Sequence, residues 1–264
     1  LRSYLDVFDG LYFAGAAGLK HRRSFDTGFY RDVLIPLFRS VLAEPAYEGK
    51  YFGLSATIGH ENCTRLGYTL SCDGTKTLRH SLESAIAGHP DLIVLPEWDE
   101  QNENTSFRPT VYNSRSTQRI VRYYMQRLRG QQPSPMDGDD TDIPNLVVSY
   151  RKILTLGEQL DIEVLHIPDG TARDAATVTV ELLDEAGTVL ERLTPATFPG
   201  GLLADRTWQI PSERFSACRA LRPRLVVTRN GDTLTVDEGL HHIRLRPTWN
   251  WDYKWVKQPL RDVC

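Results

Sequence analysis

The stretch Asp91-Leu-Ile-Val-Leu-Pro96, with Glu97-Trp98-Asp99-Glu100 directly after it, decides the fold that the sequence predicts. Residues 91–96 form a short, continuous apolar run, which is typical of a parallel strand covered on both faces. Acidic side chains begin where this run ends. We therefore expect a buried parallel strand whose carboxyl end presents a group of carboxylates.

Two units of the same kind precede this strand, each made of an apolar strand, a polar loop and an amphipathic helix. The first is predicted as a strand over 4–13 and a helix from Ser24 or Thr27 to Ala43, with Pro36 as a kink or as the true helix start. The second is a strand over 51–58 and a helix over 77–87, and a further helix is predicted from Ser116 or Thr117 to Leu128. The residues expected on the buried face of the first helix are Val33, Leu34, Leu37, Phe38, Val41 and Leu42.

This strand–helix alternation implies parallel strands joined by right-handed crossovers. Three such units cannot close a barrel, and a (β/α)₈ TIM barrel takes roughly 250 residues. Residues 1–130 are therefore interpreted as the last three units of a catalytic barrel. The remainder of the barrel would lie upstream of residue 1 and would be a partner of this segment. A small open α/β sheet, complete in itself, is the alternative.

A change of pattern marks the second half of the chain. Residues 131–145 are rich in Gln, Pro, Ser, Gly and Asp, which predicts a linker. Short alternating strands separated by turn signals follow, over 160–165, 177–182, 224–228, 233–236 and 242–245. This spacing predicts an antiparallel β-sandwich of immunoglobulin-like architecture over 146–264. The expected fold class is thus α/β followed by all-β.

Composition excludes several classes of partner. Of the 264 residues, 41% are hydrophobic and 25% are charged, which is ordinary for a soluble protein. The formal net charge is −3, and the sequence has no long run of one charge sign. It therefore has no basic run that would bind the phosphate backbone of nucleic acid. No stretch approaches the roughly 20 apolar residues that span a bilayer. We predict neither a cofactor nor a metal site, because the four cysteines lack zinc-ligand spacing.

The cysteines indicate in which cellular compartment the protein is expected. Cys63 and Cys72 flank a short polar loop, so a disulfide between them is the simplest interpretation, with Cys218 and Cys264 as a second, distant pair. Reduced buried thiols are the alternative. A disulfide implies an oxidising compartment, so we expect a secreted or periplasmic protein. Two segments, 62–64 and 104–106, also match the short glycosylation pattern, which is a weak signal.

Polar clusters occur where the predicted strands end, the position of active sites in parallel barrels. Cleavage of a glycosidic bond needs one carboxyl group to protonate the leaving oxygen and a second group as nucleophile or base. Glu97 and Glu100 are the candidates, since crowded acids raise one another's pKa and keep one of them protonated. The candidate substrate-binding residues are Asp9, Tyr12, His60, Glu61, Asn62, Trp98, Asn102 and Glu103.

Other interpretations of these residues stay open. The acidic segment also fits a solvated loop or a calcium-binding loop, and His60 also fits a structural hydrogen-bonding role. The basic residues Arg22, Arg23 and Arg108 are interpreted as surface or hydrogen-bonding residues, with substrate contact as the alternative. The aromatic run 249–255 fits packing of the sandwich against the barrel better than a sugar-stacking platform, because aromatic side chains bury large areas between domains.

The third strand and its loop resemble the last barrel strand of glycoside hydrolase family 99, the endo-α-mannosidases, and the related family 71. The shared pattern is an apolar strand, Glu-Trp-x-Glu, a polar stretch with Thr, and a Pro. It stands here as Glu97-Trp98-Asp99-Glu100, Asn104-Thr105 and Arg108-Pro109-Thr110. The resemblance implies a retaining mechanism in which Glu97 assists attack by the sugar's own 2-hydroxyl and Glu100 is the acid/base. Pro96 and Gln101-Asn102-Glu103 depart from the family pattern, so we expect a different subsite around the cleaved bond.

Together these features predict a glycoside hydrolase that cleaves a polysaccharide or oligosaccharide with paired glutamates. The main alternative is a non-catalytic carbohydrate-binding protein on the same barrel-plus-sandwich scaffold. A calcium-stabilised surface or adhesion module is the second alternative.

Overall fold

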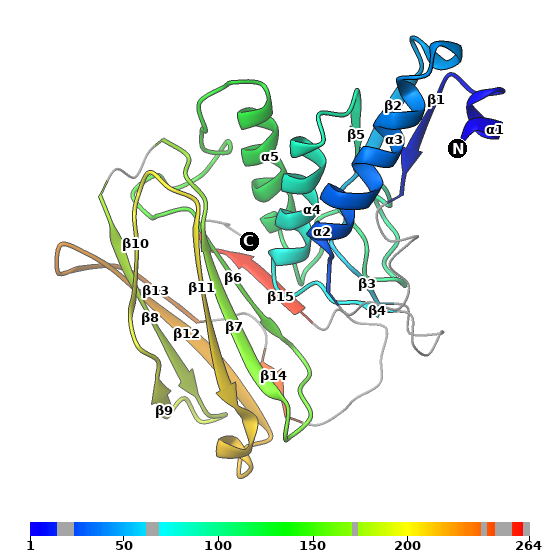
Figure 1. Cartoon of the computed structure of the whole chain (residues 1–264). Helices are drawn as coiled ribbons and strands as arrows, with labels where there is room; N and C mark the ends of the chain where they lie inside the picture. The colour runs from blue at the N-terminus through cyan, green and yellow to red at the C-terminus, as the bar shows by residue number, and fades with distance from the viewer. Residues whose placement is uncertain (15–23, 62–68, 171–173, 239–241, 246–254, 261–264) are drawn as a thin grey trace. The chain divides into compact units, whose positions relative to one another are not determined.

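The chain divides into two compact units, Leu1–Arg108 and Pro109–Cys264 (Figure 1). The computed structural model describes residues 1–14, 24–61, 69–170, 174–238, 242–245 and 255–260. The boundary between the units lies upstream of the linker expected at 131–145. Helix α5 (Ser116–Leu128) has the bounds that the sequence predicts, and it falls in the second unit.

The first unit is built on a parallel sheet with the strand order β1 (Gly10–Phe13), β2 (Tyr51–Ser55) and β5 (Leu92–Val94). The first crossover contains α2 (Thr27–Phe29), a π-helical turn (Tyr30–Leu34), α3 (Ile35–Leu42) and a 3₁₀ turn (Pro45–Tyr47). The second contains a short antiparallel pair, β3 (His60–Glu61) with β4 (Thr69–Leu70), and helix α4 (Lys76–Ala87). The strand–helix alternation expected from the sequence is confirmed, and the described strands do not close a barrel.

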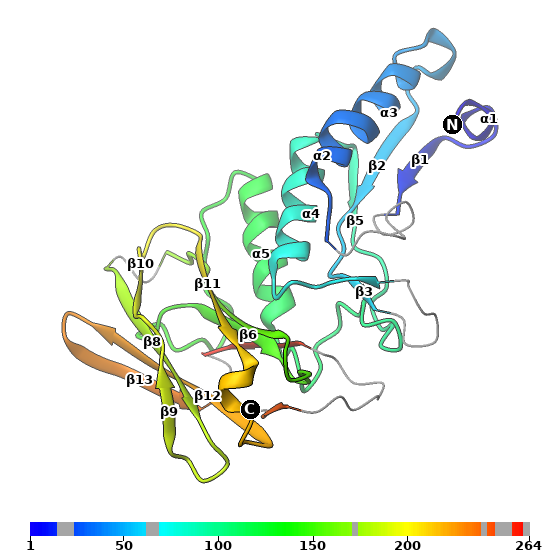
Figure 2. The same ribbon diagram turned by 60° about the horizontal axis from the view of Figure 1, so that its bottom comes forward.

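The sheet of the first unit has one covered face. Figures 1 and 2 show α3 and α4 lying along it. Leu54 is fully buried there, and Phe52 stacks on Phe38 of α3 with 4.7 Å between ring centroids. The residues that form this core include Leu11, Phe13, Phe52, Leu54 and Ile93 from the three strands, with Tyr30, Leu34, Phe38 and Ala85 from the helices.

The opposite face of the same sheet is open to solvent in this structure. It carries Tyr12, Tyr51 and Leu92, whose exposed fractions are 54%, 56% and 43%. Gly53 lies between Tyr12 and Leu92 in the strand register, and a Cβ there would come within 2.7 Å of Tyr12 and 2.9 Å of Leu92. Among the described residues the third strand is therefore covered on one face only, because β5 is an edge strand whose other face is exposed.

The amino-terminal segment is not the strand expected over 4–13. Residues Arg2–Leu5 form helix α1, closed by a hydrogen bond from the Asp6 N–H to the Arg2 carbonyl at 2.9 Å. Leu5 is buried whereas Phe8 is 55% exposed, so the apolar residues here follow a helical turn and not the alternation of a strand. Pairing with β2 begins only at Gly10, which places Asp9 at the amino-terminal end of the sheet.

The first long helix also differs in detail from its prediction. Its cap is Asp26, whose side chain accepts a hydrogen bond from the Phe29 N–H at 2.9 Å, and not Ser24 or Thr27. Pro36 lies in the first turn of α3 and has no N–H for the carbonyl one turn earlier, which fits the wider π-helical turn before it.

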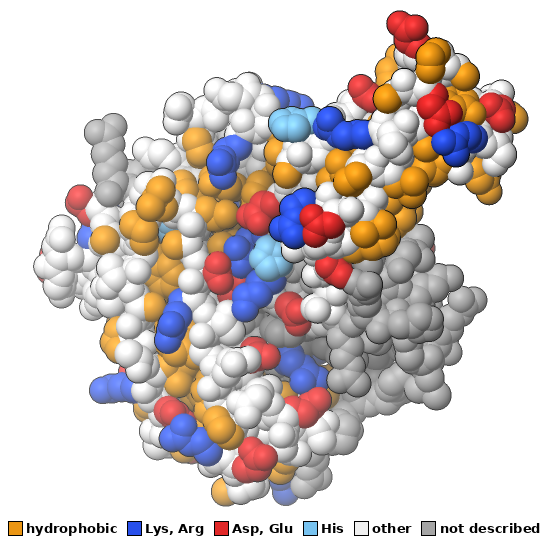
Figure 3. Space-filling model, viewed as in Figure 1, with side chains coloured by type: hydrophobic (Ala, Val, Ile, Leu, Met, Phe, Trp, Pro, Cys, Tyr) orange, Lys and Arg blue, Asp and Glu red, His pale blue; other side chains and the backbone are white. Residues whose placement is uncertain are grey.

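The π-helical turn and α3 bury fewer of their apolar residues than expected. Leu34, Phe38 and Val41 are buried, but Val33 and Leu37 are exposed. Figure 3 shows hydrophobic side chains at the surface along α2 and α3.

The second unit contains two antiparallel sheets. One has the order β11 (Ala204–Pro211), β7 (Gln159–His166), β6 (Leu146–Arg151) and β15 (Trp255–Pro259). The other has the order β10 (Ala196–Phe198), β8 (Ala176–Leu183), β12 (Ala220–Arg229) and β13 (Asp232–Glu238). Two short strands extend it, β9 (Val189–Arg192) beside β8 and β14 (Ile243–Arg244) beside β12.

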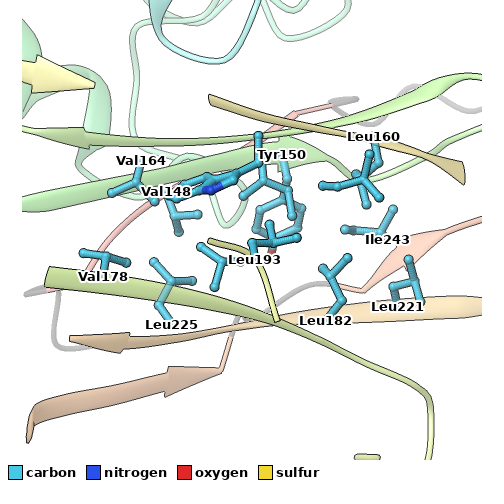
Figure 4. Close-up of a cluster of buried hydrophobic side chains, with 14 of the residues drawn as sticks. Val148, Tyr150, Leu160, Val164, Val178, Leu182, Leu193, Leu221, Leu225 and Ile243 are labelled. Atoms are coloured by element: carbon cyan, nitrogen blue, oxygen red, sulfur yellow. The ribbon is translucent and has the colours of Figure 1, made fainter. Parts of the chain in front are cut away.

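The two sheets share one hydrophobic core (Figure 4). Val148, Tyr150 and Val164 point into it from one sheet, and Val178 and Leu225 point into it from the other. Full burial of one such aliphatic side chain contributes about 1.5–3 kcal/mol, so this core is the main source of stability in the second unit. The antiparallel, β-rich second half expected from the sequence is confirmed.

Residues 131–145 pack against helix α5. The Arg122 Nη2 and Gln126 Nε2 atoms both donate to the Ser134 hydroxyl, at 2.9 and 2.8 Å. Arg119 forms an ion pair with Asp139, and the two side chains are only 1% and 3% exposed. A segment whose composition resembles that of a linker is thus held by a buried charge pair.

A second charged group, on the outer side of the β8 sheet, makes part of the stability of this unit dependent on pH. Glu181 is 6% exposed, and its carboxylate accepts hydrogen bonds from Arg192 at 2.6 Å and Arg224 at 2.7 Å. Burial raises the pKa of this carboxyl, but the hydrogen bonds and charges of Arg224 and Arg192 outweigh burial, so the pKa of Glu181 is lowered.

Replacing Glu181 by glutamine should reduce the free energy of unfolding by about 2 kcal/mol at pH 7. This value lies between the usual cost of breaking a surface ion pair and that of breaking a buried one. A lowered folded-state pKa adds stability that is present above the unfolded value near 4.5 and is lost as the pH falls through the folded value. The difference between wild type and variant in urea unfolding should therefore shrink below about pH 4.5. Glu191→Gln, which breaks a more exposed pair with Arg214, is the control and should cost less than about 0.5 kcal/mol.

The cysteines and helices give two further findings. Cys218 is a free thiol, and Cys63 and Cys264 lie outside the described residues, so the expected disulfides have no support here. Within the described ranges, no helix combines the length and the apolar composition that a bilayer-spanning helix needs.

Candidate active site

The polar residues after β2 and β5 come together at the carboxyl edge of the parallel sheet. His60 follows β2, and the loop 95–108, here called the glutamate loop, follows β5. Because β2 and β5 are parallel neighbours, both segments leave the same edge of the sheet. The structure brings Glu103 within 3.4 Å of His60, measured from Glu103 Oε2 to His60 Nδ1. Of the three polar clusters expected to converge, the second and third thus meet through His60 and Glu103.

His60 is held in place by its neighbours in the strand pair β3–β4. Its backbone pairs with Leu70, and its side chain is 8% exposed. Gly59 precedes it with φ of +148°, and a Cβ at this position would come within 2.9 Å of both Cys72 Sγ and the Leu70 carbonyl oxygen. Only glycine permits this close approach of the two strands.

The glutamate loop folds back on itself, so its acidic half is supported by its polar half. The Ser106 hydroxyl and the Arg108 N–H both donate to the Trp98 carbonyl, at 2.9 and 2.8 Å. The Thr105 hydroxyl donates to the Glu100 carbonyl at 3.2 Å. Thr105 and Ser106 are buried, whereas Glu97 and Trp98 are exposed. The buried half thus fixes the backbone of the two candidate catalytic residues.

Glu97 adopts a backbone conformation that is unusual for a residue with a side chain. Its φ is +68°, in the left-handed region, and its carbonyl accepts a hydrogen bond from the Phe107 N–H at 3.3 Å. A non-glycine residue in this region costs about 1–2 kcal/mol relative to right-handed backbone. The chain turns sharply here, directly after Pro96, and this turn brings the acidic segment over the end of the sheet.

The charges of the glutamate loop act on His60. Burial lowers the pKa of His60, and the negative charges of Glu103, Glu97 and Glu100 raise it only in part, so the pKa lies below its ordinary value. At neutral pH the imidazole is therefore uncharged. An uncharged imidazole beside the Glu103 carboxylate can donate one hydrogen bond and accept another without neutralising the acid.

The other predicted site residues lie at different places. Asp9 is at the opposite edge of the sheet, where its side chain is 97% exposed and 3.5 Å from Lys50, so its expected place among the site residues is wrong. Tyr12 lies on the open face of β1. Asn102 and Trp98 are exposed on the glutamate loop, with Trp98 59% exposed. Asn62 lies outside the described residues, as do Arg22 and Arg23.

Asn104 also supports this site, and no motif in the sequence indicates that role. Its Nδ2 atom donates to the Glu61 carbonyl at 2.8 Å, and the residue is 5% exposed. The segment 104–106 matches the glycosylation pattern, but a buried, hydrogen-bonded amide offers no nitrogen for a glycan in this fold. The available signal was a run of small polar residues before Phe107, which is as typical of a packed loop as of an exposed one.

Metal binding finds no support at this site. Among the residues that the structure describes, no group of three or more His, Cys, Asp or Glu side chains is arranged to hold a metal ion.

Comparisons with known proteins give a coarse result. No family model matches the chain. No curated protein matches it either. Among solved structures, it is similar to a β-glucosidase from Listeria innocua in complex with isofagomine, at 18% identity and a TM-score of 0.28, over 39% of this chain and 16% of that one.

A β-glucuronidase from glycoside hydrolase family 2 matches at 15% identity and a TM-score of 0.27, over 41% of this chain and 12% of the other. The chain is thus distantly similar, over part of its length, to solved glycoside hydrolases. It spans less than a fifth of the length of either structure, 16% and 12%, and a likeness this weak carries no argument about function. The resemblance to families 99 and 71 stays a resemblance, without a family assignment.

Proposed function

We propose that the first unit carries the carboxylate site of a glycoside hydrolase that acts on a poly- or oligosaccharide. One observation carries the proposal: at the carboxyl edge of a parallel sheet a buried histidine lies 3.4 Å from Glu103, on the same loop as Glu97 and Glu100. Active sites of parallel α/β enzymes lie at this edge. Paired carboxyl groups are the usual catalysts of glycosidic cleavage.

In the proposed reaction Glu100 is the acid/base and Glu97 assists the nucleophile. The Glu100 carboxyl gives its proton to the glycosidic oxygen as the bond from this oxygen to the anomeric carbon breaks. Glu97 takes the proton of the sugar's own 2-hydroxyl as that oxygen attacks the anomeric carbon and forms a three-membered ring. Water then opens this ring at the anomeric carbon, giving a proton to the Glu100 carboxylate while Glu97 returns its proton to the 2-oxygen. Trp98, exposed between the two glutamates in sequence, is the candidate surface for stacking against a sugar ring.

We further propose that additional parallel strands cover the open face of the sheet, as in a complete (β/α)₈ barrel. The support is the exposure of Tyr12, Tyr51 and Leu92 on that face, because parallel sheets are ordinarily covered on both faces. The proposed environment is extracellular or periplasmic, where such substrates are found.

The test uses the intact protein with a panel of α-mannan, α-glucan, β-glucan and xylan. We expect release of reducing ends from at least one of them, and Trp98→Ala should weaken its binding about 3- to 10-fold because a stacking contact is lost. Tyr4→Ala is the matched control, since Tyr4 is 60% exposed and Trp98 is 59% exposed, and it should leave binding unchanged.

Calorimetric binding of a polysaccharide without any release of reducing ends would contradict the proposed hydrolase activity. It would favour a non-catalytic carbohydrate-binding protein. A steep fall of the melting temperature on chelation, without sugar binding, would favour a calcium-stabilised module.

A further inference from the structure

Two segments of the first unit are joined at one point by hydrogen bonds in both directions. The Glu61 N–H donates to the Glu103 carbonyl at 2.8 Å, and the Asn104 side-chain amide donates to the Glu61 carbonyl at 2.8 Å. Both backbone groups of Glu61 are therefore bonded to consecutive residues of the glutamate loop. The contact between His60 Nδ1 and Glu103 Oε2, at 3.4 Å, lies directly beside this junction.

The chemistry of Asn104 suits this junction. The partner atom is a carbonyl oxygen, which requires a donor, and the amide NH₂ supplies one while a carboxylate of the same shape would not. The backbone of Asn104 has φ of +56°, in the left-handed region that asparagine adopts more readily than most residues. At 5% exposure the hydrogen bond is shielded from competing water.

The junction links the ends of two different strands. Glu61 belongs to β3, which follows β2, and Glu103 and Asn104 belong to the glutamate loop, which follows β5. Apart from this link, hydrogen bonds to the Trp98 and Glu100 carbonyls tie the acidic half of the loop to its own polar half. A displacement of about 1 Å in a catalytic group can cost about 100-fold in rate, so the link has consequences for catalysis.

We infer that Asn104 is a positioning residue of this site, whose side-chain amide locks the glutamate loop to β3 and thereby holds Glu97, Glu100 and Glu103 around His60. Asn104 does not touch the substrate in this assignment. It acts through Glu61 and through the conformation of the loop. The inference rests on the proposed function only where it concerns turnover, and the junction itself is tested without any substrate.

Two variants remove the amide donor in different ways. Asn104→Gly keeps the left-handed backbone accessible and deletes the side chain. Asn104→Asp keeps the shape and places a carboxylate oxygen against the Glu61 carbonyl. The matched control is Asn230→Gly, because Asn230 also has a positive φ, +53°, but is exposed in the turn between β12 and β13.

The first readout is hydrogen exchange of the Glu61 amide in the intact protein. In both Asn104 variants this amide should exchange about 10-fold faster than in wild type. Its hydrogen bond to the Glu103 carbonyl is then no longer supported by the adjacent bond from Asn104 to the Glu61 carbonyl. The second readout is the NMR titration of His60. Loosening the loop admits water to the ring, and since burial is the largest cause of its shift, the His60 pKa should move up towards the ordinary histidine value. Asn230→Gly should change neither quantity.

On a polysaccharide that the wild type cleaves, Asn104→Gly should lower kcat about 10-fold or more and change KM less than 3-fold, since the loop geometry matters most in the transition state. Unchanged Glu61 exchange and an unchanged His60 titration in both variants would overturn the inference. So would wild-type kcat in a variant with altered exchange. If the wild type cleaves no glycan, the proposed function fails, and exchange with titration alone decides whether Asn104 positions the carboxylates.

Discussion

Replacement of Glu100 by glutamine is expected to reduce kcat of the intact protein by about 1,000-fold, with binding of the polysaccharide nearly unchanged. Glutamine keeps the shape of the side chain but has no proton to give to the glycosidic oxygen, and general acid catalysis typically contributes 10²- to 10⁴-fold. The Glu100 backbone is held by Thr105, so the substitution should leave the loop and the free energy of unfolding as they are.

The leaving group separates the role of Glu100 from that of Glu97. A nitrophenyl glycoside needs little protonation on departure, so Glu100→Gln should lose much less activity on it than on a polysaccharide. Glu97→Gln should be slow on both substrates, because assistance to the nucleophile is needed whatever the leaving group. The control is Glu48→Gln, an exposed glutamate before β2 at the other edge of the sheet. Retention of substantial polysaccharide cleavage by Glu100→Gln would refute the assignment.

The sequence predicted the helices whose apolar residues mostly lie on one packed face. Helix α4 and helix α5 were predicted within one residue of their bounds, because apolar residues recur at helical spacing along each. The first strand was misplaced because Tyr4 and Phe8 are apolar yet exposed, so their pattern reflected no buried face. Strand β6 was missed because its apolar run begins directly after the segment interpreted as a linker.

The candidate site was predictable where strand ends and acidic residues coincide. Glu97 to Glu103 and His60 follow adjacent parallel strands, and this alone brought them together. Asp9 failed as a site residue because the true start of β1 put it at the wrong end of the strand. Asn104 escaped notice because hydropathy does not distinguish a buried asparagine from an exposed one, and its partner lies 43 residues away.

Hydropathy likewise does not show that residues 131–145 contain a buried ion pair. A second large mutational effect, on stability, is expected there. Asp139→Ala should reduce the free energy of unfolding by about 3–5 kcal/mol, because it leaves the Arg119 guanidinium, 1% exposed, without its carboxylate. The lost contacts include the hydrogen bond between Arg119 Nη1 and Asp139 Oδ2 at 2.8 Å and the bond from the Met136 N–H at 3.0 Å. Urea unfolding of the variant and the wild type measures the difference.

Asp137→Ala is the matched control, since Asp137 is exposed in the same segment and its loss should change stability by less than about 0.5 kcal/mol. The double variant Arg119→Met with Asp139→Ala should recover a large part of the loss, because the penalty comes from one buried charge and not from the absence of the pair. A solvated linker would respond equally and weakly to both aspartate substitutions. Equal, small effects of Asp137→Ala and Asp139→Ala would therefore contradict the buried ion pair and restore the linker interpretation of this segment.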